Sequence, residues 1–322
     1  MAKRKRKASA STQFTNRVVR ISVVAAVVVL CLFISLNSII ELPYFPTWNS
    51  LFGDLGLSPA PLPDDQLRVT VLDVGNADCI LLQCGGQAAL IDAGESNDEE
   101  AIVSTLKAAG VEKLDLVIAT HADADHIGGM STVVNNFSIG TFWMSFMPEG
   151  HEPTTKTYEY LLLALIENKV EISEAEHGAT YTLGDATVTV LSGLSDYEDT
   201  NDQSVVCLVS HGEMDFVFTG DAGKEVEREI LEAVPDLKAE VLKVGHHGSS
   251  TSSDGNFVRA LAPEIAIITC GYGNSYGHPH TETLQTLQRN DVTVYRTDLH
   301  GQLVLTSDGK TVGVQSERGG EA

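Results

Sequence analysis

Two histidines and two aspartates lie within six consecutive residues, directly after an apolar run. The cluster is His121-Ala122-Asp123-Ala124-Asp125-His126, and the apolar run before it, residues 114–119, predicts a buried strand. Gly128 and Gly129 follow and allow a tight turn at the end of that strand. Carboxylate oxygens combined with imidazole nitrogens suit Zn²⁺, Mn²⁺ or iron. The segment therefore predicts a metal site at a strand end, in preference to a solvated polar loop.

Two later strand ends supply possible partners for this cluster. The apolar run 216–218 ends in Thr219-Gly220-Asp221, and the run 241–244 ends in Gly245-His246-His247-Gly248-Ser249. Each motif places a potential metal ligand just past a strand, where glycine permits a sharp turn. Strand-like runs alternate with helical patterns such as residues 99–109, 224–233 and 255–261. This alternation predicts an α/β fold.

The order and spacing of these motifs resemble those of the metallo-β-lactamase-fold hydrolases. The opening Leu72-Asp73-Val74-Gly75-Asn76-Ala77-Asp78 and the late Gly277-His278-Pro279-His280 are most similar to the extracytoplasmic nuclease-like domain of ComEC-type DNA-uptake proteins. The resemblance implies a four-layer αββα sandwich, in which helices cover two central sheets. It places this hydrolase domain at residues 67–316.

The resemblance further implies two divalent metal ions, zinc or manganese, that share a bridging water or hydroxide. A metal ion lowers the pKa of its bound water from about 15.7 toward about 7, which makes hydroxide available at neutral pH. Carried over by motif, the ligands are His121 and Asp123 for the first ion, Asp125, His126 and His246 for the second, and Asp221 as the bridge.

Two of these ligand positions need a further argument. Many family members have histidine where this chain has Asp123, and the added carboxylate shifts the preference from Zn²⁺ toward Mn²⁺. His246 and His247 cannot both face the site if they continue a strand, since successive side chains point to opposite faces. We expect His246 to be the ligand, and His247 to contact phosphate or to protonate the leaving group.

The other expected site residues come from polar segments. Asn201-Asp202-Gln203-Ser204 matches an Asn-x-x-Ser signature of the ComEC branch, so Asn201 or Asp202 completes the first metal site or holds substrate, with a capped turn as the alternative. Histidine in the Gly-rich segment 271–280 is a candidate general acid near neutral pH. The expected catalytic set is Asp125, His247 and His278, and the expected substrate-binding set is Asn201, Ser204, Ser249 and His280.

Further histidines and aspartates have weaker claims on the site. Most family members place one more histidine between the cluster and the bridging aspartate, and His151, His177 and His211 fall in that interval. The last two precede glycine in turn-like sequences, so we do not expect them to be ligands. Aspartates also recur at strand ends, where we expect them to orient metal-binding histidines; they are Asp73, Asp78 and Asp92.

The N-terminal region predicts a membrane anchor. Residues 1–20 contain seven basic and no acidic side chains, and residues 21–40 are uncharged, long enough for one transmembrane helix. The basic flank predicts a cytoplasmic tail, so residues 67–316 would lie outside a single-pass cell-membrane protein. A cleaved signal peptide is the alternative. Residues 41–66 contain five prolines and predict a linker.

Charge and cysteine content bear on substrate and compartment. The whole chain carries a net charge of −23, which becomes −30 once the basic residues 1–20 are set aside, and this disfavours long-range attraction of a polyanion. An exported domain permits disulfides, and the sequence leaves open whether the cysteines outside the anchor are paired or free thiols; these are Cys79, Cys84, Cys207 and Cys270.

Three functions remain open at this point. The resemblance implies cleavage of phosphodiester bonds, with DNA as substrate and a separate uptake channel protein as partner. The second function is that of a hydrolase of the same fold that acts on an envelope phosphodiester, such as a phosphorylcholine-type ester, or on a lactam or lactone. The third is that of a binding module without catalysis, which the intact set of acidic and histidine ligands disfavours.

Overall fold

The computed structural model describes residues 29–30, 32–33, 63, 65–145 and 152–319. The chain divides into two compact units, residues 1–61 and residues 62–322. The tail 1–20, most of the expected membrane helix 21–40 and most of the linker 41–66 lie outside the described residues. Within the described part of the chain, no helix combines the length and the apolar character needed to cross a membrane.

The unit 62–322 contains two β-sheets. The first sheet has eight strands in the order β15-β14-β1-β2-β3-β4-β5-β6, and β3 to β6 run parallel. The second has seven strands in the order β13-β12-β11-β10-β9-β8-β7, and β10 to β13 run parallel. The strands of the first sheet are β1 (Leu67–Val71), β2 (Ile80–Cys84), β3 (Gln87–Ile91), β4 (Lys113–Ala119), β5 (Ser138–Met144), β6 (Ile172–Glu174), β14 (Leu303–Ser307) and β15 (Val312–Ser316). Those of the second are β7 (Thr180–Leu183), β8 (Ala186–Val190), β9 (Cys207–His211), β10 (Met214–Phe218), β11 (Val241–Lys243), β12 (Ile265–Ile268) and β13 (Thr293–Arg296).

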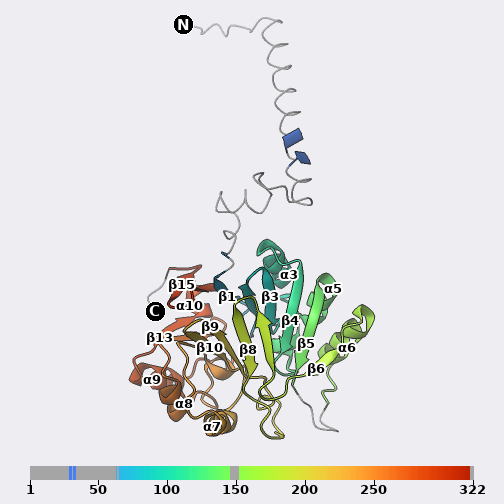
Figure 1. Ribbon diagram of the computed structural model, residues 1–322. Helices are drawn as coiled ribbons and strands as arrows, with labels where there is room; N and C mark the ends of the chain where they lie inside the picture. Colours follow the sequence, from blue (N-terminus) through green and yellow to red (C-terminus); the bar gives the residue numbers. More distant parts are fainter. Residues whose placement is uncertain (1–28, 31, 34–62, 64, 146–151, 320–322) are drawn as a thin grey trace, which may run out of the picture. The chain divides into compact units, whose positions relative to one another are not determined.

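Helices cover the outer face of each sheet (Figure 1). They are α3 (Glu99–Ala108), α4 (Ala124–Ile127), α5 (Met130–Asn136) and α6 (Lys156–Asn168) beside the first sheet, and α7 (Lys224–Ala233), α8 (Gly255–Leu261) and α9 (Thr281–Arg289) beside the second, with the short α10 (Thr297–His300) after β13. The expected sandwich of two sheets between helices is confirmed.

Three apolar cores hold these layers together. The central core fills the space between the sheets, and each outer core joins one sheet to its helices. Strand β4 shows why residues 116–119 are all apolar. Leu116 and Ile118 point into the central core, whereas Val117 and Ala119 point into the outer core below the helices. A strand covered on both faces needs apolar residues at successive positions.

The C-terminal ends of strands β4, β10 and β11 meet where the two sheets approach each other. The backbone N–H of Val205 donates to the Thr120 carbonyl (2.8 Å), which ties a loop of the second sheet to the end of β4. Gly220 follows β10 with a φ of +52°, and a Cβ added there would lie 3.1 Å from the Thr120 Cβ. Glycine at this position therefore permits both the turn and the close approach of the two loops.

Each of the four cysteines of this unit is a free, buried thiol. Cys79, Cys84, Cys207 and Cys270 lie in or beside strands, and the apolar cores surround them. Of the two possibilities that the sequence left open, the structure has the free thiols. They act as small apolar core residues rather than as covalent links.

Candidate metal centre

Four potential ligands converge at the strand ends. One ligand atom from each of Asp125, His126, Asp221 and His247 lies within 4.8 Å of every other. The first two follow β4, Asp221 follows β10, and His247 follows β11. The site is therefore shared between both sheets.

Several of these ligand atoms are buried and have no hydrogen-bond partner. They are Nε2 of His126, Oδ1 of Asp221 and Nε2 of His247, together with Nε2 of the neighbouring His121. A buried polar atom without a partner costs about 1–3 kcal/mol, and native structures rarely leave one unexplained. Here the unpartnered atoms face one another and are of the types that bind divalent metals. The residues therefore fit a metal ion.

The buried imidazoles are held so that Nε2 faces the cluster. Nδ1 of His126 lies 2.7 Å from Oδ2 of Asp92, whose other oxygen accepts from the Thr120 backbone N–H. Nδ1 of His247 lies 2.9 Å from the Thr269 carbonyl, so it is the protonated nitrogen. Such contacts leave the Nε2 lone pair available to a metal and fix the ring.

His121 and Asp123 lie at one side of the four-residue cluster. The His121 ring centroid is 4.1 Å from that of His126, and its Nε2 is 3.9 Å from Oδ2 of Asp123. The Asp123 side chain is 45% exposed, so it lies at the solvent edge. This pair is placed where it could hold one metal ion while the four-residue cluster holds another. Among the described residues, the pair offers fewer buried ligands than the cluster does.

Burial and mutual charge shift the pKa values of these groups. Burial and the charge of His126 lower the pKa of His121 to about 3. For Asp221, burial disfavours the carboxylate, but His247 and His126 outweigh it and hold its pKa well below the ordinary range. Burial likewise opposes the charge on His126, and Asp221 and Asp92 reverse this and raise its pKa. The site thus keeps Asp221 ionised among imidazoles.

The two adjacent histidines occupy the reverse of their expected places. His247 is 1% exposed and its Nε2 lies 3.4 Å from Asp125 and 3.5 Å from Asp221. His246 is 26% exposed, with Nε2 3.6 Å from Asp221 and Nδ1 beside the Thr251 hydroxyl. Strand β11 ends at Lys243, and both histidines have a positive φ (48° and 52°), so strand alternation does not apply. The geometry favours His247 over His246 as the ligand.

Two expected substrate contacts are instead internal. The Ser204 side chain is fully buried, and its hydroxyl accepts from the Asp221 backbone N–H (3.1 Å) and lies 3.3 Å from Nδ1 of His121. Ser249 is 4% exposed and its hydroxyl accepts from Thr251. Both residues are buried away from any substrate, so they shape loops that carry ligands, and their expected role in substrate binding is corrected.

The remaining candidates lie outside the four-residue cluster. Asn201 is partly buried in a turn, and its carbonyl accepts from the Ser204 N–H. His280 accepts from the Ser250 N–H through Nδ1 (2.9 Å), which makes it part of a loop contact at the start of α9. His177 and His211 contact Leu191 and Ser307 away from the cluster, and His151 lies outside the described residues.

His278 lies above the cluster and differs from the general acid that we expected. Its ring is 6.4 Å from that of His247, and its Nδ1 is buried without a partner. Burial lowers the pKa of His278 to about 4, and the charges of His246, His247 and His280 act in the same direction. The imidazole is therefore neutral at neutral pH.

A buried ion pair behind the site has no counterpart in the sequence-based expectations. Nζ of Lys243 lies 2.7 Å from Oδ2 of Asp78, and both side chains are at most 2% exposed. The other Asp78 oxygen lies 3.5 Å from Nδ1 of His247 and accepts from the Thr269 hydroxyl. The structure agrees with an orienting role for Asp92, whereas Asp78 contacts His247 only at longer range and holds the Thr269 hydroxyl. Asp73 instead pairs with Arg318.

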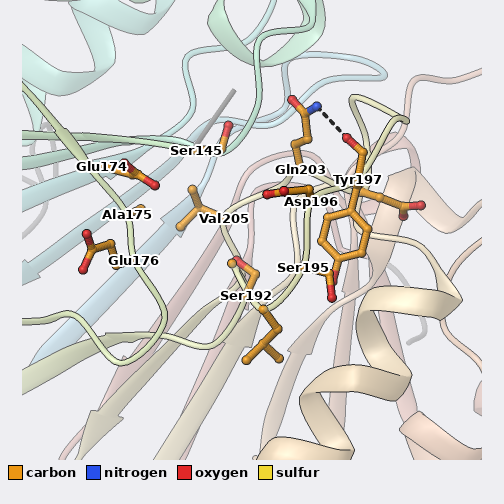
Figure 2. Close-up of a pocket in the computed structure, with 13 residues that line it drawn as sticks. Ser145, Glu174, Ala175, Glu176, Ser192, Ser195, Asp196, Tyr197, Gln203 and Val205 are labelled. Carbon is orange, nitrogen blue, oxygen red and sulfur yellow. Dashed lines mark hydrogen bonds between the residues drawn. The ribbon is translucent and has the colours of Figure 1, made fainter. Parts of the chain in front are cut away.

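A cavity of about 290 Å³ is lined in part by Asp202, Gln203 and Val205 (Figure 2). Gln203 Nε2 donates to the Tyr197 carbonyl (3.0 Å) at one wall. Four of the lining side chains are acidic; they are Glu174, Glu176, Asp196 and Asp202. This acidic lining disfavours a phosphate group in the cavity, so we do not assign it to the substrate.

Comparisons with known proteins agree with this architecture. The family model for the metallo-beta-lactamase superfamily matches residues 72–272. ComE operon protein 3 of Bacillus subtilis (strain 168) is 34% identical over 262 residues, which is 76% of this chain and 33% of that protein. Competence protein ComA of Neisseria gonorrhoeae is 30% identical over 79% of this chain and 34% of its own length. The chain thus spans about a third of the length of these relatives.

Among solved structures, CmlA, a diiron beta-hydroxylase from Streptomyces venezuelae, aligns with a TM-score of 0.49 and 15% identity, covering 80% of this chain and 59% of that chain.

Proposed function

Because the chain belongs to the metallo-β-lactamase superfamily, we propose that it is a metal-dependent hydrolase that cleaves phosphodiester bonds, with DNA as its substrate. The observation that carries the proposal is the convergence of unpartnered, buried ligand atoms from His126, Asp221 and His247. The match to a competence protein supports the choice of DNA, in agreement with the ComEC-like motifs.

The chain's own residues prepare the site for this chemistry. A divalent cation bound there would acidify a water molecule and stabilise negative charge on the phosphoryl oxygens. Asp221 directs one oxygen toward His126 (3.3 Å) and the other toward His247 (3.5 Å), so its carboxylate can contact ions on both sides. Asp92 and Thr269 hold the Nδ1 protons of the two imidazoles.

Substrate would approach from the side where the ligands are least buried. The Asp125 side chain is 32% exposed and His246 is 26% exposed, while His126, Asp221 and His247 are at most 3% exposed. The buried ligands keep the geometry rigid, and the exposed side leaves room for a phosphodiester. His246 and the neutral His278 flank this opening, where each can hydrogen-bond a phosphate oxygen.

The test uses the full-length chain in detergent, treated with a chelator and then supplied with Mn²⁺ or Zn²⁺. Substrates are labelled single- and double-stranded DNA and bis-p-nitrophenyl phosphate. We expect metal-restored cleavage that Asp125→Ala and His126→Ala lack and that His177→Ala, a histidine outside the cluster, keeps. Cleavage of the small diester without DNA would replace DNA by a small phosphodiester. If the metal-loaded protein cleaves none of them, the proposal is wrong.

We also propose that residues 21–40 anchor the chain in the cell membrane with the hydrolase unit outside, and that a separate channel protein accompanies it in DNA uptake. The uncharged segment and its basic flank support the anchor. Protease added to intact cells should remove the unit that begins at residue 62, and protection from protease would contradict this orientation.

A further inference from the structure

Two tyrosines stand exposed on the loop that follows β12, beside the metal centre. Tyr272 is 87% exposed and Tyr276 is 68% exposed. Large aromatic rings at such exposure add little to the stability of the fold, because they bury little apolar area. Their place next to the open side of the ligand cluster gives them a potential role in binding.

A series of rings leads from Tyr276 to the cluster. The Tyr276 and His278 rings are stacked, with centroids 5.6 Å apart and planes inclined by 21°. The His278 ring is in turn stacked near that of His247, with centroids 6.4 Å apart and planes inclined by 29°. The exposed face of Tyr276 therefore lies about two rings away from His247, so a base stacked on it would belong to a nucleotide near the one whose phosphate lies in the metal centre.

The loop holds these rings in place before any ligand binds. The Asn274 side chain donates to the carbonyls of Gly271 (2.9 Å) and His278 (2.6 Å) and accepts from the His278 N–H (3.0 Å). Such a preformed loop loses little conformational freedom on binding. The backbone that carries both tyrosines is thus held in place, and the Tyr276 ring is further positioned by stacking on His278.

Charge points to the same kind of contact. Proteins that bind nucleic acid through phosphates alone rely on lysine and arginine, but residues 21–322 carry a net charge of −30. Affinity for a strand must then come from the metal centre and from contacts that carry no charge. Stacking of bases on aromatic rings is such a contact, and it tolerates any base sequence.

We infer that Tyr276, assisted by Tyr272, stacks unpaired bases next to the phosphodiester in the metal centre, so that the substrate is a single strand. Bases within a duplex are already stacked on each other and present no face to the tyrosines. The inference rests on the proposed function, since it names the form of DNA that this site takes.

Binding is the first test, because it does not depend on cleavage. The full-length, Mn²⁺-loaded protein is titrated with a fluorescent, phosphorothioate-linked single strand, with an abasic strand of the same length, and with the duplex. Loss of one stacked base typically costs roughly 5- to 150-fold in affinity. We expect Tyr276→Ala to weaken binding of the single strand by such a factor, and Tyr276→Phe to restore it. Tyr160→Ala, an exposed tyrosine on α6, is the matched control.

The abasic strand separates stacking from other effects. Tyr276→Ala should leave affinity for the abasic strand unchanged. Equal affinities of the wild-type protein for the abasic and the base-bearing strand would overturn the inference, as would an unchanged affinity of Tyr276→Ala for the base-bearing strand. Failure of the proposed function shows differently, as a metal-loaded protein that cleaves neither DNA nor the diester.

Discussion

The carboxylate of Asp92 lies 2.7 Å from Nδ1 of His126, and both side chains are fully buried. The same carboxylate accepts from the backbone N–H and the hydroxyl of Thr120 at the end of β4. Asp92 thus connects the strand end to the imidazole and turns Nε2 of His126 toward Asp221. Asp92 is not one of the four residues of the cluster, yet it sets the orientation of one of them.

Replacing Asp92 by asparagine should weaken metal binding. A neutral amide accepts the Nδ1 proton of His126 more weakly than a carboxylate does, so the tautomer protonated on Nε2 becomes more populated. That tautomer cannot bind a metal through Nε2, and the affinity for metal should fall about 10- to 100-fold. A competition titration against a chromogenic chelator measures this change. Asp73→Asn, which alters a carboxylate that pairs with Arg318 instead, should bind metal as the wild-type protein does. Equal affinities of the Asp92 and Asp73 variants would exclude the orienting role.

The adjacent histidines should differ in their effect on metal content. His247→Ala removes a buried ligand atom and should leave the protein with less bound metal after desalting, as measured by elemental analysis. His246→Ala removes a more exposed ring at the edge of the cluster and should retain the metal of the wild-type protein. The opposite order would restore His246 as the ligand.

Loss of Lys243 should destabilise the fold more than loss of an exposed lysine. Lys243→Met leaves Asp78 buried without its partner, and breaking a buried pair in this way costs about 3–5 kcal/mol. Urea unfolding of the chelator-treated protein measures the free energy. The control is Lys113→Met, which removes an ammonium exposed to solvent beside Asp115 and should therefore cost much less. Adding Asp78→Asn to Lys243→Met should recover part of the loss, and its failure to do so would argue against an uncompensated charge as the cause.

Stability should depend on pH through Glu227. Burial raises the pKa of Glu227 from its ordinary value of 4.5 to about 7, although the N–H groups of Asp254 and Ser253 partly oppose this. Above pH 4.5 the unfolded chain releases the proton and the folded chain keeps it, so this contribution to stability is full below 4.5 and is lost as pH rises to about 7. The loss amounts to about 3 kcal/mol.

Glu227→Gln should remove that pH dependence, because the amide does not ionise. The amide also faces a backbone N–H unfavourably, but this cost is the same at every pH. Unfolding free energies at pH 4.5 and pH 7.5 should therefore differ less in this variant than in the wild-type protein. Glu225→Gln, on the exposed side of the same helix, should keep the wild-type dependence. If the unfolding free energy changes by the same amount between the two pH values in all three proteins, Glu227 is not the cause of the pH dependence.

Helices and strands with strong local patterns were predictable from the sequence. The expected ranges 224–233 and 255–261 coincide with α7 and α8, because apolar residues at helical spacing, such as Val226 and Ile230, face one core. Strands β6 and β15 gave no such signal. All three residues of β6 are exposed, and β15 is a partly exposed edge strand, so neither has a clear apolar face.

The same limit applies to the site. The family resemblance implied a set of ligands, and the structure brings Asp125, His126, Asp221 and His247 of the expected site residues together at strand ends of both sheets. The motifs could not indicate that His246 and His247 both adopt a positive φ, or that Lys243 is buried against Asp78, because these follow from the packing of distant segments. The burial of Ser204 was missed for the same reason, as its neighbours come from loops of both sheets.

The ligands of the cluster are divided between the two halves of the chain, since Asp125 and His126 follow β4 whereas Asp221 and His247 follow strands of the second sheet. A nascent chain that has emerged only as far as β9 holds half of this set. Hydrolytic capacity would thus arise late in synthesis, when the second sheet has docked against the first. A partly made or half-folded chain would lack the complete set of ligands, so a metal centre of this kind could form only after both sheets have folded.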